Sequence, residues 1–423
     1  MIAKKVGKAT ITVKTEEGYS DTCNIYVTKD SKTKVKITKL AFDVSSKQVN
    51  IGDKIIINVS FTPSNATIRD LDWKSSDTNV AKVDSQGRVT AVGYGNATIT
   101  ATATDGSGKT GKLVLAVVVK GNYIDIRNKT YTNYYEGIET SISSNKNIHM
   151  QNFLIDNFGK SNETVYLTTV FKGNIGYVEG EGISSANKSK ITRTLIFKLD
   201  RNTTNNKKRP TMYVENTGHG QAVDMDSSGN MWINAYGKAY AAGGHWWGGH
   251  SGLMNIKYQE NNSGDEVSPI IEFKIVDSNN KEYKLPTPAI DEKNDLIAIT
   301  TGDNIVVPKS TKILIYKYSD FKKGKFTLVY SFNRVSTIDT SVYRQGSALK
   351  DGYYYETRSG STGSTNYLEV FNLLGEQIYK VKLANDMEAK KEKQREFIFT
   401  TIIYILVLQE IVMFLILDII NNY

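Results

Sequence analysis

Residues 218–237 read GHGQAVDMDSSGNMWINAYG, and the pattern in this stretch decides the expected fold. Alternating apolar residues run up to Asp226, a Ser-Ser-Gly-Asn turn follows, and a second apolar run contains Trp232. Alternation with a period of two predicts β-strands, and Gly229 suits the positive φ of a tight hairpin turn. We therefore expect two antiparallel strands, with Asp226 forming the turn and Trp232 packed between neighbouring sheets.

The same pattern occurs four times in the second half of the chain. A strand, a polar turn and a second strand occupy residues 151–169, 221–235, 286–301 and 344–357, in that order. Each unit then continues with two more apolar strands, such as TLIFKLD (194–200) and TMYVEN in the first unit. Four-stranded units repeated at intervals of roughly 60–70 residues predict a β-propeller of four to five blades, and hence an all-β fold.

The phrase HGQ-x-x-D-x-D-x-x-G-N-x-W-I in the quoted stretch also resembles a known family. It is similar to the propeller shared by phage receptor-binding proteins, teichoic-acid-associated proteins and helveticin-type bacteriocins, over about residues 130–385. The resemblance implies five blades and an association with Gram-positive cell surfaces. Only four units are recognisable here, and residues 122–135 are the candidate for strands that close the ring.

The first part of the chain contains a different repeat. VGKATITVKTEEG (6–18) aligns with YGNATITATATDG (94–106) at an offset of 88 residues. The second copy has a complete context over residues 36–119, including Gly52-Asp53, the TPSNA turn, Trp73, Gly87 and Gly95. This combination resembles the bacterial Ig-like domain of group 2, a stalk and presentation module of surface proteins. The resemblance implies a β-sandwich, in which we expect Trp73 to lie in the core.

The composition excludes several kinds of site. Cys23 is the single cysteine, so the chain has no intrachain disulfide and no zinc site of several thiolates. No Ser-His-Asp arrangement, P-loop or GxGxxG motif is visible, and no cofactor is expected. The formal net charge of +9 suits an anionic partner, although lysines scattered along strands also fit ordinary solvated faces.

One cluster of polar and aromatic residues is the candidate ligand site. Its members lie in or near the glycine-rich stretch GGHWWGGHSG and the quoted HGQ motif: His219, Gln221, Asp224, His245, Trp246, Trp247 and His250. Exposed Trp rings stack on sugar rings, while His, Gln and Asp bond hydroxyl groups, so we expect a glycan platform. The alternatives are blade-edge caps with Trp246 and Trp247 packed between blades, or a divalent metal site for which no fixed ligand spacing exists.

The C-terminal tail contains 21 residues (397–417) with one charge, Glu410. This length suffices for a membrane helix. The basic residues that precede it would then keep the β-rich body in the cytoplasm, which conflicts with Ig-like surface modules. The other interpretation is an out-of-frame tail in place of a fifth blade.

These patterns predict five regions. They are a partial Ig-like domain (1–30), an Ig-like domain (36–119), a linker with ring-closing strands (120–145), a propeller (146–385), and a charged then apolar tail (386–423). The first residues lack the apolar stretch of a signal peptide, so we expect a cell-surface or secreted protein whose sequence begins downstream of its true N-terminus.

The predicted function is non-catalytic recognition at a bacterial or phage surface. The Ig-like modules would present a propeller that binds a cell-wall or host-surface glycan, anionic polymers included, in adhesion, phage attachment or bacteriocin targeting. No nucleic acid, metal or catalytic residue is expected, and a membrane is a partner only if residues 397–417 form an anchor. The alternative is a propeller enzyme acting on cell-wall polymers, with Asp224 and Asp226 as its carboxylates.

Overall fold

The structure is a computed structural model, and it describes the chain in separate ranges. These are residues 5–28, 34–119, 148–156, 161–171, 193–200, 211–215, 223–235, 252–259, 271–274, 286–301, 310–335, 342–360, 366–383, 402–408 and 411–417. Strands dominate these ranges, and the all-β fold class is confirmed. Among them, the short α2 (Tyr318–Phe321) and the 3₁₀ turn η3 (Glu292–Asn294) are helical.

Residues 39–118 form a two-layered β-sandwich, the Ig-like module. One layer has the order β4 (Ser46–Asn50), β11 (Thr110–Val118), β10 (Gly95–Ala103) and β7 (Leu71–Ser75). The other layer contains the pair β3 (Lys39–Phe42) and β6 (Val59–Thr62), and the trio β5 (Lys54–Ile56), β9 (Arg88–Ala91) and β8 (Ala81–Val83). Alternate residues of β10 are buried, as the period-two pattern predicts.

The core of this module confirms the prediction for Trp73. Its ring stacks on Phe42 at a centroid distance of 5.7 Å and lies against the buried cluster that includes Ile99 and Leu113. The turn residue Gly87 has a φ of +74° and its Cα lies against this indole, so a Cβ there would come within 2.5 Å of the ring. Only glycine satisfies both conditions at this position.

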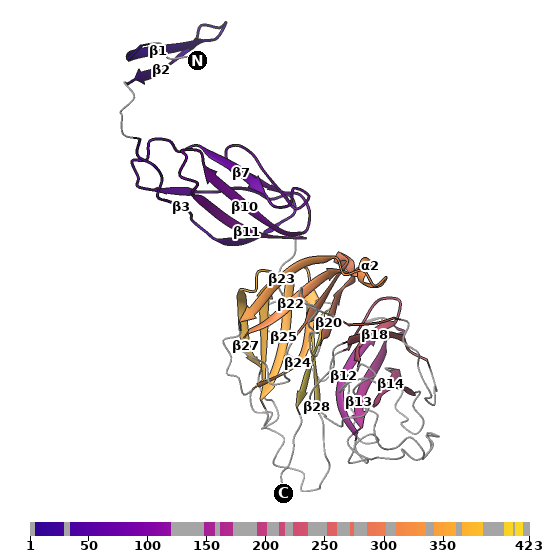
Figure 1. The fold of residues 1–423 in the computed structure, drawn as a ribbon. Coiled ribbons are helices and arrows are strands. Elements are labelled where there is room, and N and C mark those ends of the chain that lie inside the picture. Colours follow the sequence, from indigo (N-terminus) through magenta and orange to yellow (C-terminus); the bar gives the residue numbers. More distant parts are fainter. Residues whose placement is uncertain are drawn as a thin grey trace.

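A separate hairpin precedes the Ig-like module. It is formed by β1 (Gly7–Lys14) and β2 (Ser20–Val27), paired antiparallel. In Figure 1 the hairpin lies beyond the Ig-like module, at the opposite end of the molecule from the sheets that follow in the chain.

Four consecutive four-stranded antiparallel sheets follow, and we call them the sheet assembly. The first contains β12 (Ile148–Asp156), β13 (Thr164–Phe171), β14 (Arg193–Asp200) and β15 (Thr211–Glu215), and the second β16 (Val223–Met225), β17 (Asn230–Ala235), β18 (Gly252–Lys257) and β19 (Ile271–Lys274). The third contains β20 (Thr287–Asp291), β21 (Leu296–Thr300), β22 (Ser310–Lys317) and β23 (Leu328–Val335), and the fourth β24 (Val342–Lys350), β25 (Tyr353–Gly360), β26 (Asn366–Asn372) and β27 (Gln377–Leu383). The four predicted strands of each repeat are therefore confirmed.

The first strands of the sheets follow one another in a circular order. β12 lies against β16, β16 against β20 and β20 against β24. The circle continues from β24 to β29 (Ile411–Leu417), and β29 in turn lies against β12. The β28–β29 pair thus lies between the fourth and first sheets. A β-propeller would order its first strands in the same way, and the propeller itself stays a prediction.

The interpretation of the C-terminal tail as a membrane helix is wrong. Residues 402–408 and 411–417 form the antiparallel strands β28 (Ile402–Leu408) and β29. A uniformly apolar run does not distinguish a helix from a buried strand, because it has no periodicity. In the ranges that the structure describes, no helix has the length and apolar character needed to cross a bilayer. Residues 122–135, the candidate for ring-closing strands, lie outside the described residues.

The Ig-like module packs on one end of the third and fourth sheets. The Tyr330 hydroxyl in β23 accepts a hydrogen bond from the Gly95 amide (3.1 Å) and donates one to the Val117 carbonyl (2.5 Å). Gln48 donates to the Gly352 carbonyl and accepts from the Leu373 amide. Tyr330, Gly352 and Leu373 all lie at or next to connections between consecutive strands at the same end of the sheets. We call this end the turn end.

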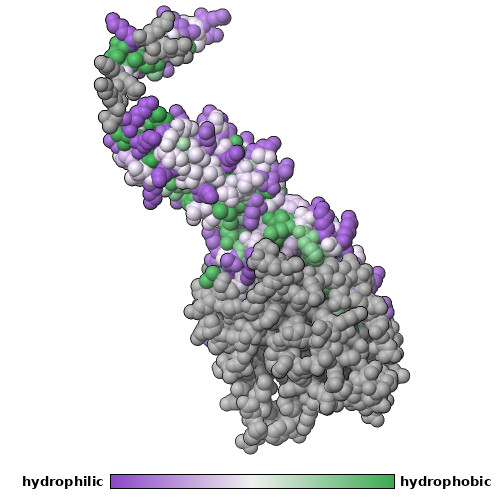
Figure 2. All heavy atoms as spheres, viewed as in Figure 1, coloured by the Kyte–Doolittle hydropathy of each residue, from purple (hydrophilic) through white to green (hydrophobic). Residues whose placement is uncertain are grey.

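Apolar contacts extend this junction. Ala116 and Val118 share one buried cluster with Leu296, Leu349 and other residues of the third and fourth sheets. Figure 2 shows apolar residues gathered where the two parts meet. Such a junction fixes the Ig-like module relative to the sheets, and the other end of the sheet assembly faces away from it (Figure 1).

We expect Tyr330→Phe to weaken this junction. The change leaves the buried Gly95 amide and Val117 carbonyl without their partner, which costs about 1–3 kcal/mol. Urea denaturation and amide hydrogen exchange at Gly95 measure the effect. Tyr26→Phe, at an exposed tyrosine, is the control, and equal behaviour of the two variants would contradict the prediction.

Candidate functional site

Of the seven predicted ligand residues, the structure describes Asp224 alone. His219, Gln221, His245, Trp246, Trp247 and His250 lie outside the described residues. The described strands still define where their segments attach. Residues 216–222 connect β15 to β16, and residues 236–251 connect β17 to β18. In an antiparallel meander these two connections start from the same end, opposite the turn end, and we call it the loop end.

Asp224 joins two neighbouring sheets. It lies in β16, and its carboxylate accepts hydrogen bonds from the Ile290 amide of β20 (2.6 Å) and from the Met225 amide (2.8 Å). Burial, opposed by the two amide hydrogen bonds and assisted by the neighbouring Asp226 carboxylate, raises the pKa of this carboxyl to about 7. Asp224 therefore holds the second and third sheets together, and its carboxylate is engaged with backbone donors.

Asp226 is turn-forming, as predicted. Its carboxylate accepts from the backbone amides of Ser228 and Asn230, and Gly229 adopts a φ of +77°. Burial raises its pKa, but the hydrogen bonds from Asn230, Tyr318 and Ser228 outweigh burial and leave the pKa below its usual value. The two aspartates thus have different environments although they stand two residues apart.

A chain of hydrogen bonds links this turn to Trp232. The Trp232 indole donates to the Tyr318 hydroxyl (2.9 Å), which donates to the Asp226 carboxylate (2.8 Å). The indole is fully buried among residues of the third sheet and α2, including Phe321 at a centroid distance of 5.2 Å. The prediction that Trp232 packs between neighbouring sheets is therefore confirmed.

Hydrogen bonds between the turns also connect successive sheets. The Ser227 amide donates to the Glu292 carboxylate of the next turn (2.8 Å), and the Asp351 amide donates to the Asp291 carboxylate (2.9 Å). Asp291 also accepts from the Asn294 side chain (2.7 Å). At the turn end, the acidic side chains of the repeat thus act as acceptors for the neighbouring sheet.

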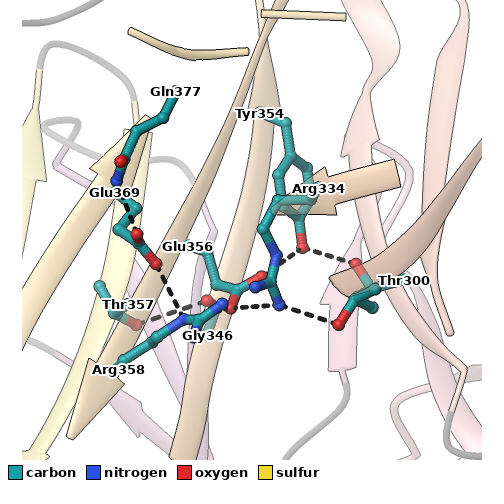
Figure 3. Close-up of polar contacts among 10 residues, drawn as sticks. Thr300, Arg334, Gly346, Tyr354, Glu356, Thr357, Arg358, Glu369 and Gln377 are labelled. Carbon is teal, nitrogen blue, oxygen red and sulfur yellow. Dashed lines mark hydrogen bonds and ion pairs between the residues drawn. The ribbon is translucent and has the colours of Figure 1, made fainter. Parts of the chain in front are cut away.

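A second polar group, which the sequence patterns did not reveal, lies between the third and fourth sheets (Figure 3). The Glu356 carboxylate of β25 pairs with Arg334 of β23 (3.0 Å) and with Arg358 (2.8 Å). Arg358 also pairs with Glu369 of β26 (2.9 Å), which accepts from the Gln377 side chain. The two arginine and two glutamate side chains are at most 1% exposed, so two positive and two negative charges balance inside the protein.

Neutral groups extend this charged network. Arg334 donates to Thr311 (3.0 Å), and the Thr300 hydroxyl lies 2.5 Å from the Tyr354 hydroxyl, which reaches Glu356 (3.4 Å). Among the residues that the structure describes, Nε and Nη1 of Arg334 have no acceptor. One signal could have indicated this network: Glu356 and Arg358 stand two residues apart, on the same face of the strand YYYETR.

Comparison with known proteins identifies the N-terminal part. The model of the bacterial Ig-like domain (group 2) matches residues 27–114. Residues 27–114 therefore contain a bacterial Ig-like domain. The match covers the sandwich whose core surrounds Trp73 and confirms the resemblance inferred over residues 36–119, while the likeness of the second half to phage and bacteriocin propellers stays a prediction.

Two curated relatives match short stretches. An uncharacterized protein of Clostridium acetobutylicum is 37% identical over 78 residues, which is 17% of this chain and 8% of that protein. A 3-O-alpha-D-galactosyl-alpha-L-arabinofuranosidase of Bifidobacterium longum subsp. longum is 36% identical over 69 residues, 16% of this chain and 6% of that protein. The chain thus spans less than a tenth of the length of either relative.

Among solved structures, domains 5–6 of the S-layer protein SbsC are similar to part of the chain. They are 17% identical, with a TM-score of 0.18, and the match covers 42% of this chain and 96% of that one. These values carry no argument about function.

Ionisation of Asp224 makes stability depend on pH in a defined direction. The folded chain holds this proton up to about pH 7, whereas an unfolded chain releases it near pH 4. Between these values the free energy of unfolding falls as the pH rises, because the folded state binds more protons. Asp224→Asn retains an oxygen for the Ile290 amide and removes the contribution of Asp224 to the slope, which approaches about 1.4 kcal/mol per pH unit.

Urea denaturation from pH 4 to 8 tests this prediction. The control is Asp72→Asn, which alters an exposed carboxylate. Burial also raises the pKa of Asp291, so a smaller slope should remain in Asp224→Asn, and a slope as steep as in the wild type would contradict the assignment of the proton to Asp224.

Glu356→Gln should destabilise the sheet assembly severely. It leaves Arg334 and Arg358 with one carboxylate between them in a buried environment, a change that costs about 3–5 kcal/mol. Lys325→Ala is the comparison variant, because it removes the exposed ion pair with Asp320, which contributes about 0–1 kcal/mol. Urea denaturation measures both, and a loss for Glu356→Gln no larger than that for Lys325→Ala would refute the role of the network.

Proposed function

We propose that the chain is a surface recognition protein of a bacterium or phage, in which the Ig-like module presents the loop end of the sheet assembly to a glycan or cell-wall polymer. The proposal uses the sequence-predicted set, in which Asp224 positions the site and the others contact the ligand: His219, Gln221, Asp224, His245, Trp246, Trp247 and His250. Adhesion, phage attachment and bacteriocin targeting all use such recognition.

The observation that carries the proposal is that the two ends of the sheet assembly differ in what they contact. The Ig-like module contacts the sheets at the turn end, through Gln48, Tyr330 and the cluster around Val118. The opposite end faces away from the module (Figure 1). A presentation module on one end leaves the other end free for a large partner.

Strand direction supports the choice of residues. The segments with the histidines and the Trp246-Trp247 pair attach to strand ends at the loop end, from β15 to β16 and from β17 to β18. Asp224 lies in β16, which follows the HGQ motif in the sequence, but its carboxylate bonds to the Ile290 amide. Its part in the proposal is therefore to position the segment that precedes β16, and contact with the ligand is assigned to the others.

Charge supports an anionic polymer as the ligand class. The chain has 53 Lys and Arg against 44 Asp and Glu, a formal net charge of +9. The carboxylates described at the turn end lie at the opposite end of the sheets from the proposed ligand residues, and distance and salt weaken their repulsion of an anion there. Long-range attraction of this kind raises association rates and weakens with salt.

The test is binding of the full chain to purified wall teichoic acid and to a glycan array. We expect Trp246→Ala and Trp247→Ala each to weaken binding at least about tenfold, because stacking on a sugar ring is lost while the fold is retained. Tyr19→Ala, at an aromatic residue that is 76% exposed on the N-terminal hairpin, is the matched control.

Unchanged binding in both tryptophan variants, or no binding by the wild type, would overturn the proposal. Release of product during incubation with the polymer would favour the alternative of an enzyme acting on cell-wall polymers. Binding without product release is the expected result.

A further inference from the structure

The N-terminal hairpin β1–β2 repeats the hairpin β10–β11 of the Ig-like module with the same register. Gly7 pairs with Val27 and Ile11 with Cys23. The corresponding pairs in the module are Gly95 with Val117 and Ile99 with Leu113. Each residue of β1–β2 therefore has a defined counterpart in β10–β11.

The two hairpins differ in what covers them. In β10–β11, one face is fully buried: Ala97, Ile99, Ala101, Leu113 and Leu115 are at most 2% exposed. The counterparts in β1–β2 form the apolar hairpin face, which we define as Ala9, Ile11, Val13, Cys23 and Ile25. Val13 is 66% exposed where its counterpart is 0% exposed, and Cys23 is exposed. Figure 2 shows apolar residues on the surface of this hairpin.

The Ig-like module shows which contacts cover the corresponding face of β10–β11. The outer edge of β10 pairs with β7, and the outer edge of β11 pairs in parallel with β4. The opposite layer then covers the face with residues such as Val80, Ala81 and Val89. In the described residues, β1 and β2 pair only with each other, so both outer edges and the apolar face are open. Open edges and an apolar face are the features that recruit further strands.

We propose that the apolar hairpin face binds the strands of a second Ig-like module equivalent to β3–β9, completing a sandwich in which β1–β2 provides the last two strands. The equal register positions Ile11 and Cys23 where Ile99 and Leu113 meet the opposite layer. The partner is thus defined chemically as an Ig-like strand set that lacks its final hairpin. This inference is independent of the proposed function, since it concerns neither the loop end nor a glycan.

The test uses the full chain and a separately produced fragment of residues 34–93, which carries β3–β9 and lacks β10–β11. The fragment is diluted from urea in the presence of the full chain, and binding is measured by co-elution in size-exclusion chromatography. The second readout is alkylation of Cys23 by a maleimide. We expect co-elution and at least about tenfold slower alkylation, because the counterpart Leu113 is 1% exposed.

Two variants make the test specific. Ile11→Asp places a charge on the apolar hairpin face and should abolish both effects, while Thr12→Asp places the same charge on the opposite face of β1 and should preserve them. Absence of co-elution with the wild type, or equal co-elution with Ile11→Asp, would overturn the proposal. Protection of Cys23 in the full chain alone, together with a dimer that Ile11→Asp dissociates, would also overturn it by assigning the face to a second copy.

Discussion

Inner strands of the second and third sheets are buried on both faces, and the rest of the architecture follows from this constraint. Every residue of β21 is buried, as are the first five residues of β18. A sheet that is apolar on both faces must lie between two neighbours. A linear stack would leave two uncovered faces at its ends, whereas a circular order leaves none. The contacts from β12 through β16, β20 and β24 to β29 and back to β12 have this circular order.

Polar contacts determine how the stacked sheets are aligned. At the turn end, acidic side chains accept hydrogen bonds from the next sheet, as in the pair of Asp224 with the Ile290 amide. Between the third and fourth sheets, the buried Arg334, Glu356, Arg358 and Glu369 form a charged network (Figure 3). Apolar packing has no direction, but charged and hydrogen-bonded pairs require one register, so these groups specify the mutual position of the sheets.

The junction with the Ig-like module gives the molecule two different ends. Tyr330 lies between the Gly95 amide and the Val117 carbonyl, and Gly352 fits against Val118, where a Cβ would come within 2.8 Å of the valine side chain. This contact covers the turn end of the third and fourth sheets. The proposed recognition function depends on the consequence that the loop end faces away from the module. The N-terminal hairpin, at the far side of the Ig-like module, raises the separate question of which strands cover its apolar face.

Local patterns in the sequence determined the strands and turns. The alternation in GNATITATA and the Ser-Ser-Gly-Asn turn after Asp226 depend on neighbouring residues alone, and the structure contains the strands and the hairpin turn that they predict. The Ig-like sandwich was also predictable, because its turn residues occur in a specific order. Trp232 could be assigned to an inter-sheet position because a large aromatic in a buried strand of a repeat has no other place to pack.

Only the tertiary structure decided which residues meet across sheets. It paired Asp224 with the Ile290 amide, buried four charges between the third and fourth sheets, and formed strands from the apolar tail that length alone had suggested as a helix. These outcomes depend on residues far apart in the chain, for which a single sequence contains no periodic signal. The apolar runs at 402–408 and 411–417 fit a helix or a strand equally well by composition, and only their pairing and the contacts of β29 with β24 and β12 show them as strands.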